Sequence, residues 1–211
     1  MRETSEEQIC VLDSEGYTCT VTQYFPSLRV EFTGDGDIDA DGAYEAYHPE
    51  NDPGLDYLAN AGSPGNWWGI TCDENGNPHI QCESDPAPGF HVSPTAYCWS
   101  QYAENNPLRY VDAARVPFIV VQSDVRNKTT GIVMGCRARV TNLENGRTVE
   151  CGVFDIGPKD KLGEISIAAA FVLGINGDPK SGGIDEPILK YELWPDQPAR
   201  IQGVEYNLIP A

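Results

Sequence analysis

The segment RTVECGVFDIGPKDKLGEISIAAAFVLG, residues 147–174, decides the fold, because it passes from a strand pattern to a helix pattern around a single break. Residues 147–156 combine β-branched and apolar side chains and follow the pair Asn145-Gly146, which is a strong hairpin signal. Residues 131–143, before that pair, have the same strand character. The sequence therefore predicts two antiparallel strands in the second half of the chain.

The pair Gly157-Pro158 ends the second strand, and residues 163–175 follow with a helical pattern that ends near Gly174. This interpretation puts Asp155 at a strand end and Glu164 in the first turn of a helix. Each acid then has an ordinary structural role: Asp155 caps the turn, and Glu164 interacts with the helix dipole, worth ~0.3–1 kcal/mol. Both acids nevertheless face one loop among small and apolar neighbours, which favours a shared chemical role.

Further strands are predicted on both sides of this segment. They cover residues 116–123, 188–194 and 203–209, and an alternating stretch from Tyr17 to Val30 supplies an edge strand or two, interrupted by Pro26. Residues 34–107 are instead rich in Gly, Pro, Asn and Asp, which predicts long ordered loops of the kind that usually carry function.

The composition indicates one domain. The chain has 211 residues, of which 40% are apolar and 22% charged, enough for one sizeable core. Its 21 glycines and 16 prolines predict short elements joined by tight turns, and so a β-rich fold. We expect a single domain over residues 1–211, with residues 1–23 as a peripheral N-terminal segment.

The charge restricts the partners. The 32 acidic and 14 basic residues give a net charge of −18, which argues against nucleic acid or an anionic membrane surface as a partner. Such a charge attracts a cationic substrate or metal ions, although an acidic secreted protein with no such partner would have the same composition. The chain contains no run of 18 apolar residues, so no membrane-spanning helix is expected.

Seven cysteines without a C-x-x-C pair favour disulfides over a zinc or thioredoxin motif. The short spacings suggest the pairs Cys10/Cys19, Cys72/Cys82 and Cys136/Cys151, with Cys98 left over, but the connectivity stays open. Disulfides in turn indicate an oxidising, extracellular setting.

Two carboxylates in different environments fit the cleavage of a glycosidic bond, since one protonates the leaving oxygen and the other activates water or attacks directly. Burial would raise the pKa of Glu164, while a helix N-terminus would oppose that rise. Arg137 or Arg139, on the neighbouring strand, is expected to reach across and keep Asp155 ionised.

The residues around both acids resemble a known family. The strings FDIGP (154–158) and GEISIA (163–168), with PFIVV (117–121) before them, are similar to the catalytic segment of glycoside hydrolase family 75, the fungal and bacterial chitosanases. The similarity extends over residues 115–175. It implies that Asp155 and Glu164 are the essential acids, with their individual roles open.

The resemblance also implies an endo-acting, inverting enzyme that hydrolyses β-1,4 bonds in chitosan, a cationic polysaccharide, with no organic cofactor. Inversion needs carboxyl groups ~6.5–9.5 Å apart. By analogy with glycosidases and lytic enzymes that have similar strand-end aspartates, the expected fold class is α+β and β-rich: a six-stranded barrel of the double-psi kind, with one main helix and long ordered loops. The chain would act as a secreted monomer.

The acidic run GDGDIDADG, residues 34–42, has Asp35, Asp37, Asp39 and Asp41 at alternate positions. An EF-hand loop here would have a histidine where the bidentate Glu belongs, so a different calcium site over Asp37–Asp41 is one interpretation, and no metal ligand is assigned. Alternate side chains of an extended segment point the same way, so a second interpretation is that these carboxylates bind the amines of a row of sugars. A solvated acidic loop is the third.

Four aromatic residues, Trp67, Trp68, Tyr97 and Trp99, are candidates for stacking on sugar rings, although core packing is the commoner role. Adjacent side chains of a strand point to opposite faces, so one of Trp67 and Trp68 is expected to be buried and the other exposed. The three histidines lack H-x-x-x-H spacing, which disfavours a zinc hydrolase.

Two other classes of protein stay open. A noncatalytic carbohydrate-binding or wall-loosening protein on the same barrel would keep the aromatic residues but would not depend on both acids. A calcium-stabilised secreted domain would depend chiefly on the acidic run.

Overall fold

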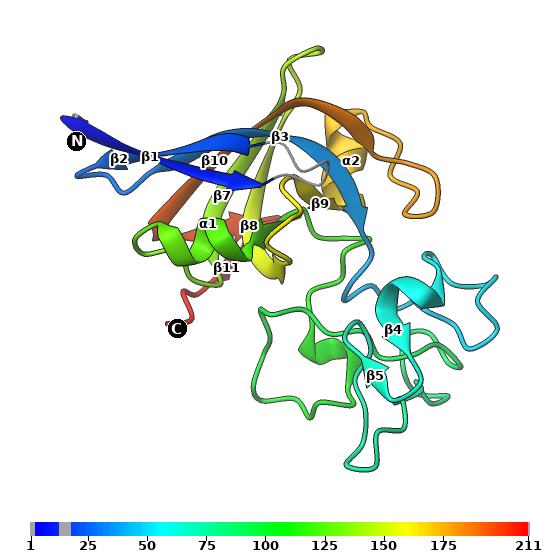
Figure 1. The fold of residues 1–211 in the computed structure, drawn as a ribbon. Coiled ribbons are helices and arrows are strands. Elements are labelled where there is room, and N and C mark those ends of the chain that lie inside the picture. Colours follow the sequence, from blue (N-terminus) through cyan, green and yellow to red (C-terminus); the bar gives the residue numbers. More distant parts are fainter. Residues whose placement is uncertain (1–2, 13–17, 211) are drawn as a thin grey trace.

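Six strands close into a mixed β-barrel in the computed structural model, which describes residues 3–12 and 18–210 (Figure 1). In order around the barrel they are β3 (Val30–Asp39), β9 (Glu164–Ser166), β6 (Phe118–Gln122), β8 (Thr148–Gly157), β7 (Cys136–Asn142) and β10 (Ile184–Ile201). The barrel closes because β10 also pairs with β3. The pairs β3–β9 and β6–β8 are parallel and the others antiparallel. The predicted β-rich six-stranded barrel is confirmed.

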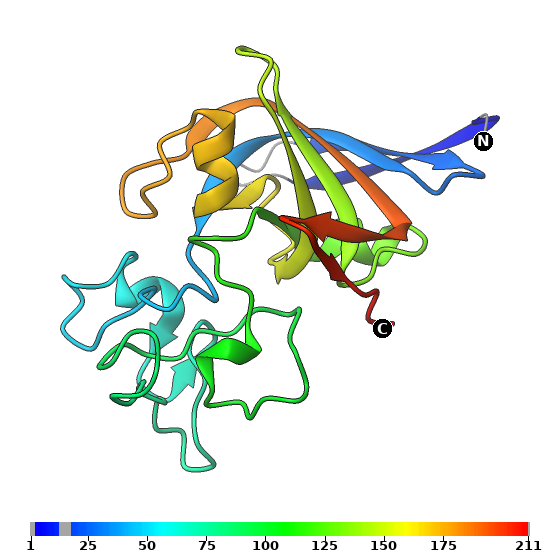
Figure 2. The same ribbon diagram turned by 180° about the vertical axis from the view of Figure 1, so that it is seen from behind.

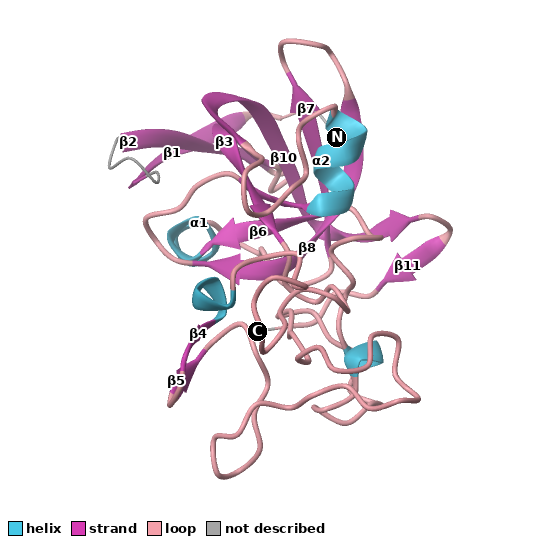
Figure 3. Ribbon diagram, turned by 90° about the vertical axis from the view of Figure 1, so that its right-hand side faces the viewer, coloured by secondary structure: helices cyan, strands magenta, loops and turns pink. Residues whose placement is uncertain are grey.

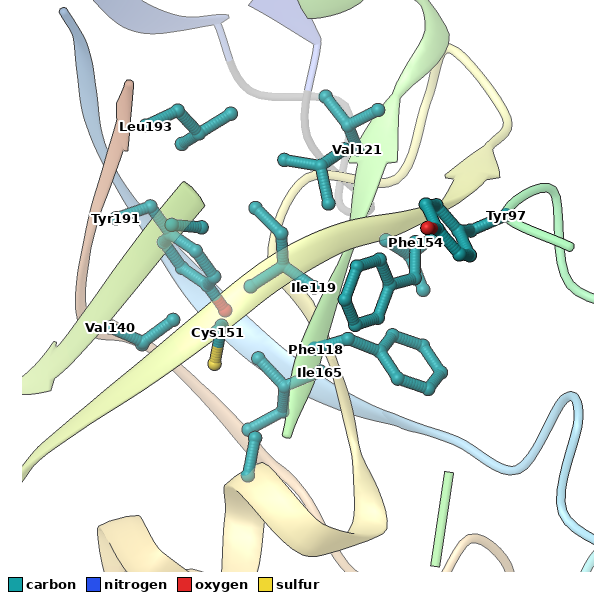
Figure 4. Packing of buried hydrophobic residues seen from close by; sticks show 14 of the residues in the cluster. Tyr97, Phe118, Ile119, Val121, Val140, Cys151, Phe154, Ile165, Tyr191 and Leu193 are labelled. Carbon is teal, nitrogen blue, oxygen red and sulfur yellow. The ribbon is translucent and has the colours of Figure 1, made fainter. Parts of the chain in front are cut away.

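The barrel is filled by alternate residues of its strands, which face inward. Ile119 and Val121 of β6 lie inside with Ile165 of β9 and Tyr191 of β10, as Figure 4 shows. The Tyr191 ring stacks on Phe32 at 4.8 Å between centroids, and its hydroxyl donates to the Asp35 carbonyl at 2.7 Å. Alternation of side chains along each strand therefore separates a barrel interior from an outer face.

The hairpin of β1 (Ser5–Leu12) and β2 (Thr18–Phe25) lies outside the closed barrel and projects from it (Figures 1 and 2). It joins the barrel where Thr22 and Gln23 pair with the start of β3. The predicted stretch from Tyr17 to Val30 thus forms β2 and the start of β3, although Tyr17 itself lies outside the described residues.

Residues 40–117 form a lobe of long loops beside the barrel, coloured mostly as loop in Figure 3. Its regular elements are two short 3-10 helices, Leu58–Ala61 and Pro107–Arg109, and the strands β4 (Gly62–Ser63) and β5 (Asn66–Trp67). We call this segment the loop lobe. Its ordered loops match the prediction made for residues 34–107, except that residues 34–39 belong to β3.

Three elements complete the fold: α1 (Ser123–Lys128), α2 (Ile167–Leu173) and β11 (Val204–Tyr206), which pairs with β10. None of the helices within residues 3–12 and 18–210 has the length and apolar character needed to cross a membrane.

The helix predicted over residues 163–175 begins later, at Ile167, and Glu164 lies in strand β9 instead. Residues 164–166 are strand because β3 and β6 bond them from both sides, which the local sequence does not reveal. Ser166 caps α2, and Gly174 ends it in the left-handed conformation as predicted.

None of the three suggested disulfides is formed: Cys10, Cys72, Cys82, Cys136 and Cys151 are thiols. Cys136 lies diagonally across from Cys151, since Cys151 opposes Ala138, and diagonal neighbours are too far apart to bond. Cys10 opposes Thr20, so the adjacent Cys19 faces the other side of the hairpin. The disulfide prediction was wrong at these positions.

Ser166 joins the barrel to α2, and we expect Ser166→Ala to destabilise the protein by roughly 2–4 kcal/mol. The buried hydroxyl accepts from Ala169 N at 3.2 Å and Phe118 N at 2.9 Å and donates to Val116 O at 3.0 Å, so alanine leaves these groups without a partner. Urea unfolding measures the loss. Ser63→Ala, at an exposed position, is the matched control and should change stability little; equal stability of both variants would contradict this account.

Candidate active site

A cleft of about 700 Å³ lies between the outer face of the barrel and the loop lobe. The barrel and the loop that follows β8 line it with Asp39, Val120, Asp155, Lys161 and Glu164. The loop lobe lines the other side with residues that include Asp41, Tyr47, Asn60, Trp68 and Ala96. The cleft therefore brings both predicted catalytic acids together with two acids of the predicted acidic run.

Strand β6 positions Asp155 and Glu164 at one level. Val120 of β6 pairs with Asp155 of β8 on one side and with Glu164 of β9 on the other. Because neighbouring strands lie ~4.8 Å apart, the Cα atoms of the two acids are about 10 Å apart. An inverting glycosidase needs ~6.5–9.5 Å between the carboxyl groups themselves, and two side chains that extend from this backbone spacing into one cleft can reach that separation.

A β-bulge in β8 turns Asp155 toward the cleft. Ile119 pairs with Val153, but the next residue, Val120, pairs with Asp155, so Phe154 is an extra residue in β8. If β8 had no bulge and Phe154 paired with Val120, regular alternation would place Asp155 inside the barrel, on the same face as Ile119 and Val121. The bulge instead places the carboxylate on the outer face, next to Val120.

Two glycines, Gly157 and Gly163, make room around Glu164 and the neighbouring backbone. A Cβ on Gly157 would lie 3.3 Å from Glu164 Oε2 and 3.2 Å from Val120 Cγ1. Gly163 has φ +107°, and a Cβ there would meet the Asp35 carbonyl oxygen. A larger side chain at position 157 would crowd the Glu164 carboxylate, and one at position 163 would collide with the Asp35 backbone of β3.

Lys161 is the cation of the cleft. Its ammonium lies 3.0 Å from Glu164 Oε1 and 3.2 Å from Asp37 Oδ2. Burial raises the pKa of Glu164 above its ordinary value, and the nearby ammonium opposes that rise. Glu164 is therefore the acid of the cleft whose charge has a direct counter-ion.

Asp155 is held by backbone amides. Its Oδ1 accepts from Ile156 N at 2.8 Å and from Ala96 N at 3.2 Å. Burial and the negative charge of Asp41 nevertheless raise the pKa of Asp155 well above its ordinary value. Tyr97 N also donates to Phe154 O at 2.8 Å, so the loop lobe is attached to β8 next to this carboxylate.

Asp39 and Asp41 lie beside this pair. Asp39 Oδ1 accepts from Asp41 N at 2.7 Å, and Asp41 Oδ1 accepts from Tyr47 Oη at 2.8 Å and Ser93 Oγ at 3.1 Å. Burial raises the pKa of Asp41 to about 7, and burial with the charges of its acidic neighbours raises that of Asp39. The cleft therefore contains four carboxyl groups in a poorly solvated space.

The other two acids of the run do not line the cleft. Asp37 binds Lys161, and the Asp35 backbone contacts Gly163 and Tyr191. Residues 35–39 belong to strand β3, so an EF-hand loop is not formed. No group of three or more His, Cys, Asp or Glu in the described part of the chain is arranged to hold a metal ion. Calcium binding by this run stays a prediction.

The aromatic candidates divide into two groups. Trp68 lines the cleft and is 61% exposed, whereas Trp67 packs against the core, as expected for neighbours on opposite faces. Tyr97 is only 4% exposed and packs with Trp99 against Tyr206. Tyr97 was therefore predicted wrongly as a stacking surface, because it is buried. Trp99 is partly buried, and its role in stacking stays a prediction.

The expected arginine partner of Asp155 was also wrong. Arg137 and Arg139 pair with Glu150 and lie over the Trp194 ring. The register explains this, since Arg137 opposes Gly152, three residues before Asp155. Sequence reasoning missed Lys161, although its position three residues before Glu164 was visible in the sequence.

No protein-family model matches the chain, and a comparison with curated proteins found no match.

We expect the melting temperature to fall between pH 5 and pH 8, by on the order of 5 °C. An unfolded Asp loses its proton near pH ~3.9, whereas folded Asp41 keeps it up to about pH 7. Folding therefore retains a proton that the unfolded chain releases, and this stabilisation is lost as the pH rises through 7. Thermal unfolding followed by circular dichroism measures the profile.

The variant Asp41→Asn should flatten this profile and raise the melting temperature at pH 8, since its amide still accepts from Tyr47 and Ser93 but carries no charge. Glu74→Gln removes one exposed carboxylate and should leave the profile unchanged. A profile that changes equally in both variants would attribute the effect to net charge and not to the cleft.

Proposed function

We propose that this protein is an endo-acting, inverting glycoside hydrolase that cleaves β-1,4 bonds of chitosan with Asp155 and Glu164. The observation that carries the proposal is the pairing of both acids with Val120 from opposite sides of β6, facing one cleft. The cleft acids and the net charge of −18 favour a cationic polysaccharide. Action outside the cell, as a monomer and without an organic cofactor, belongs to the same proposal.

The surroundings of the two acids suggest separate roles. The ammonium of Lys161 favours the ionised form of Glu164, which suits a general base that takes a proton from water. The raised pKa of Asp155 suits a general acid. Its Oδ1 accepts two amide hydrogens, which leaves Oδ2 to carry the proton.

In this mechanism Asp155 donates its proton to the glycosidic oxygen as the bond to the anomeric carbon breaks. Glu164 removes a proton from a water molecule that attacks the anomeric carbon from the opposite face, so the configuration is inverted. Trp68 offers an exposed ring face on the cleft wall for a neighbouring sugar. Lys161 acts as a positioning residue through Glu164.

Asp155→Asn and Glu164→Gln should each lower the release of reducing ends from highly deacetylated chitosan at pH 5–6 by roughly a hundredfold or more, because each removes an acid or a base. Asp160→Asn, an exposed change in the loop between the two acids, is the matched control and should retain activity. If the unaltered chain releases no reducing ends at any degree of acetylation but still binds the polymer, the noncatalytic alternative replaces this proposal.

Lys161→Gln should move the acidic limb of the pH–rate profile to higher pH by about 1–2 units, since Glu164 loses the cation that lowers its pKa. Lys161→Arg should largely restore the position of that limb. A uniform loss of rate at every pH, with the limb unmoved, would indicate that Lys161 has only a structural role.

A further inference from the structure

One carboxylate oxygen in the cleft has no donor. Asp39 is 7% exposed and lines the cleft, and its Oδ2 has no hydrogen-bond partner among the described residues. A buried carboxylate oxygen without a donor is costly, so such an atom in a cleft indicates a ligand that supplies one.

The two acids are rigid before any ligand arrives. Asp41 Oδ1 accepts from Tyr47 Oη and Ser93 Oγ, and the Asp41 amide donates to Asp39 Oδ1. Ser93 is itself buried and also accepts from Gly42 N at 3.2 Å. This arrangement fixes both carboxylates, which lowers the entropy lost on binding.

The cleft also lacks positive charge near these acids. Lys161 is the one Lys or Arg among the described residues that line it, and its ammonium is bound by Glu164 and Asp37. Asp39 and Asp41 therefore face the cleft without a cation of their own, which favours a cationic ligand. A bound ammonium would lower their raised pKa values and displace the proton that Asp41 otherwise keeps up to about pH 7.

A substrate ammonium fits these features better than a metal ion, because the described residues contain no group of three metal ligands. We propose that Asp39 and Asp41 form a subsite for the protonated 2-amino group of one glucosamine unit of the substrate. Two N–H groups of the ammonium would bond to Asp39 Oδ2 and to the Asp41 carboxylate, while Trp68 contacts a sugar face. An N-acetylated unit has no charge and would bind this subsite weakly.

The identity of the substrate rests on the proposed function, but the subsite is testable without catalysis. We would measure binding of a fully deacetylated glucosamine hexamer and its fully N-acetylated counterpart to Glu164→Gln at pH 5.5, by isothermal titration calorimetry. The deacetylated hexamer should bind roughly 10- to 100-fold more tightly, as expected for a charge-assisted hydrogen bond.

Adding Asp39→Asn should remove most of this preference, and Asp41→Asn, which retains an acceptor for Tyr47, provides a second test if the first variant fails to fold. Asp52→Asn makes the same chemical change at an exposed position of the loop lobe and should keep the preference. A preference that persists in both cleft variants would overturn the inference, as would displacement of the deacetylated hexamer by millimolar Ca²⁺.

Two results separate this inference from the proposed function. If the tighter binding of the deacetylated hexamer depends on Asp39 but the chain cleaves no glycan, the subsite is supported and the hydrolase is rejected. If cleavage of chitosan depends on Asp155 and Glu164 but the binding preference does not depend on Asp39, the hydrolase is supported and the subsite is rejected.

Discussion

The pairing of β6 with both β8 and β9 at Val120 is the constraint on which the rest of the site depends. A central strand flanked on both sides holds the two acids of its neighbouring strands at one level, which no single loop could do as rigidly. The bulge at Phe154 then sets which way Asp155 faces. Gly157 leaves room for the Glu164 carboxylate, and Gly163 allows the chain just before Glu164 to pass close to Asp35.

This geometry places charge where solvation is poor. Asp39, Asp41, Asp155 and Glu164 all have a raised pKa, and burial is the largest cause for each. One ammonium, that of Lys161, is shared between Glu164 and Asp37. The different surroundings of the acids separate their protonation behaviour, which is how one cleft can offer both an acid and a base.

Local sequence was informative where a single element sufficed. The turn at Asn145-Gly146, the strand ending near Gly157 and the helix end at Gly174 were all predicted from backbone preferences of a few residues. The same reasoning failed at Glu164, which local propensity assigned to a helix. There the hydrogen bonds from β3 and β6 outweigh propensity, because strands distant in the sequence supply them: Glu164 pairs with Asp37 and with Val120.

Composition and turn signals in the sequence determined a β-rich fold with long ordered loops, since those depend on local backbone and burial preferences. The six-stranded barrel was expected only by analogy with other glycosidases. The sequence also identified Asp155 and Glu164 as acids in unusual surroundings. Only the tertiary structure decided that Asp39 and Asp41 join them, that Trp68 and not Tyr97 faces the cleft, and that Lys161 is the neighbouring cation. The physical reason is that register, the bulge and the docking of the loop lobe are set by contacts between segments distant in sequence, and a one-residue change in register moves a side chain to the opposite face.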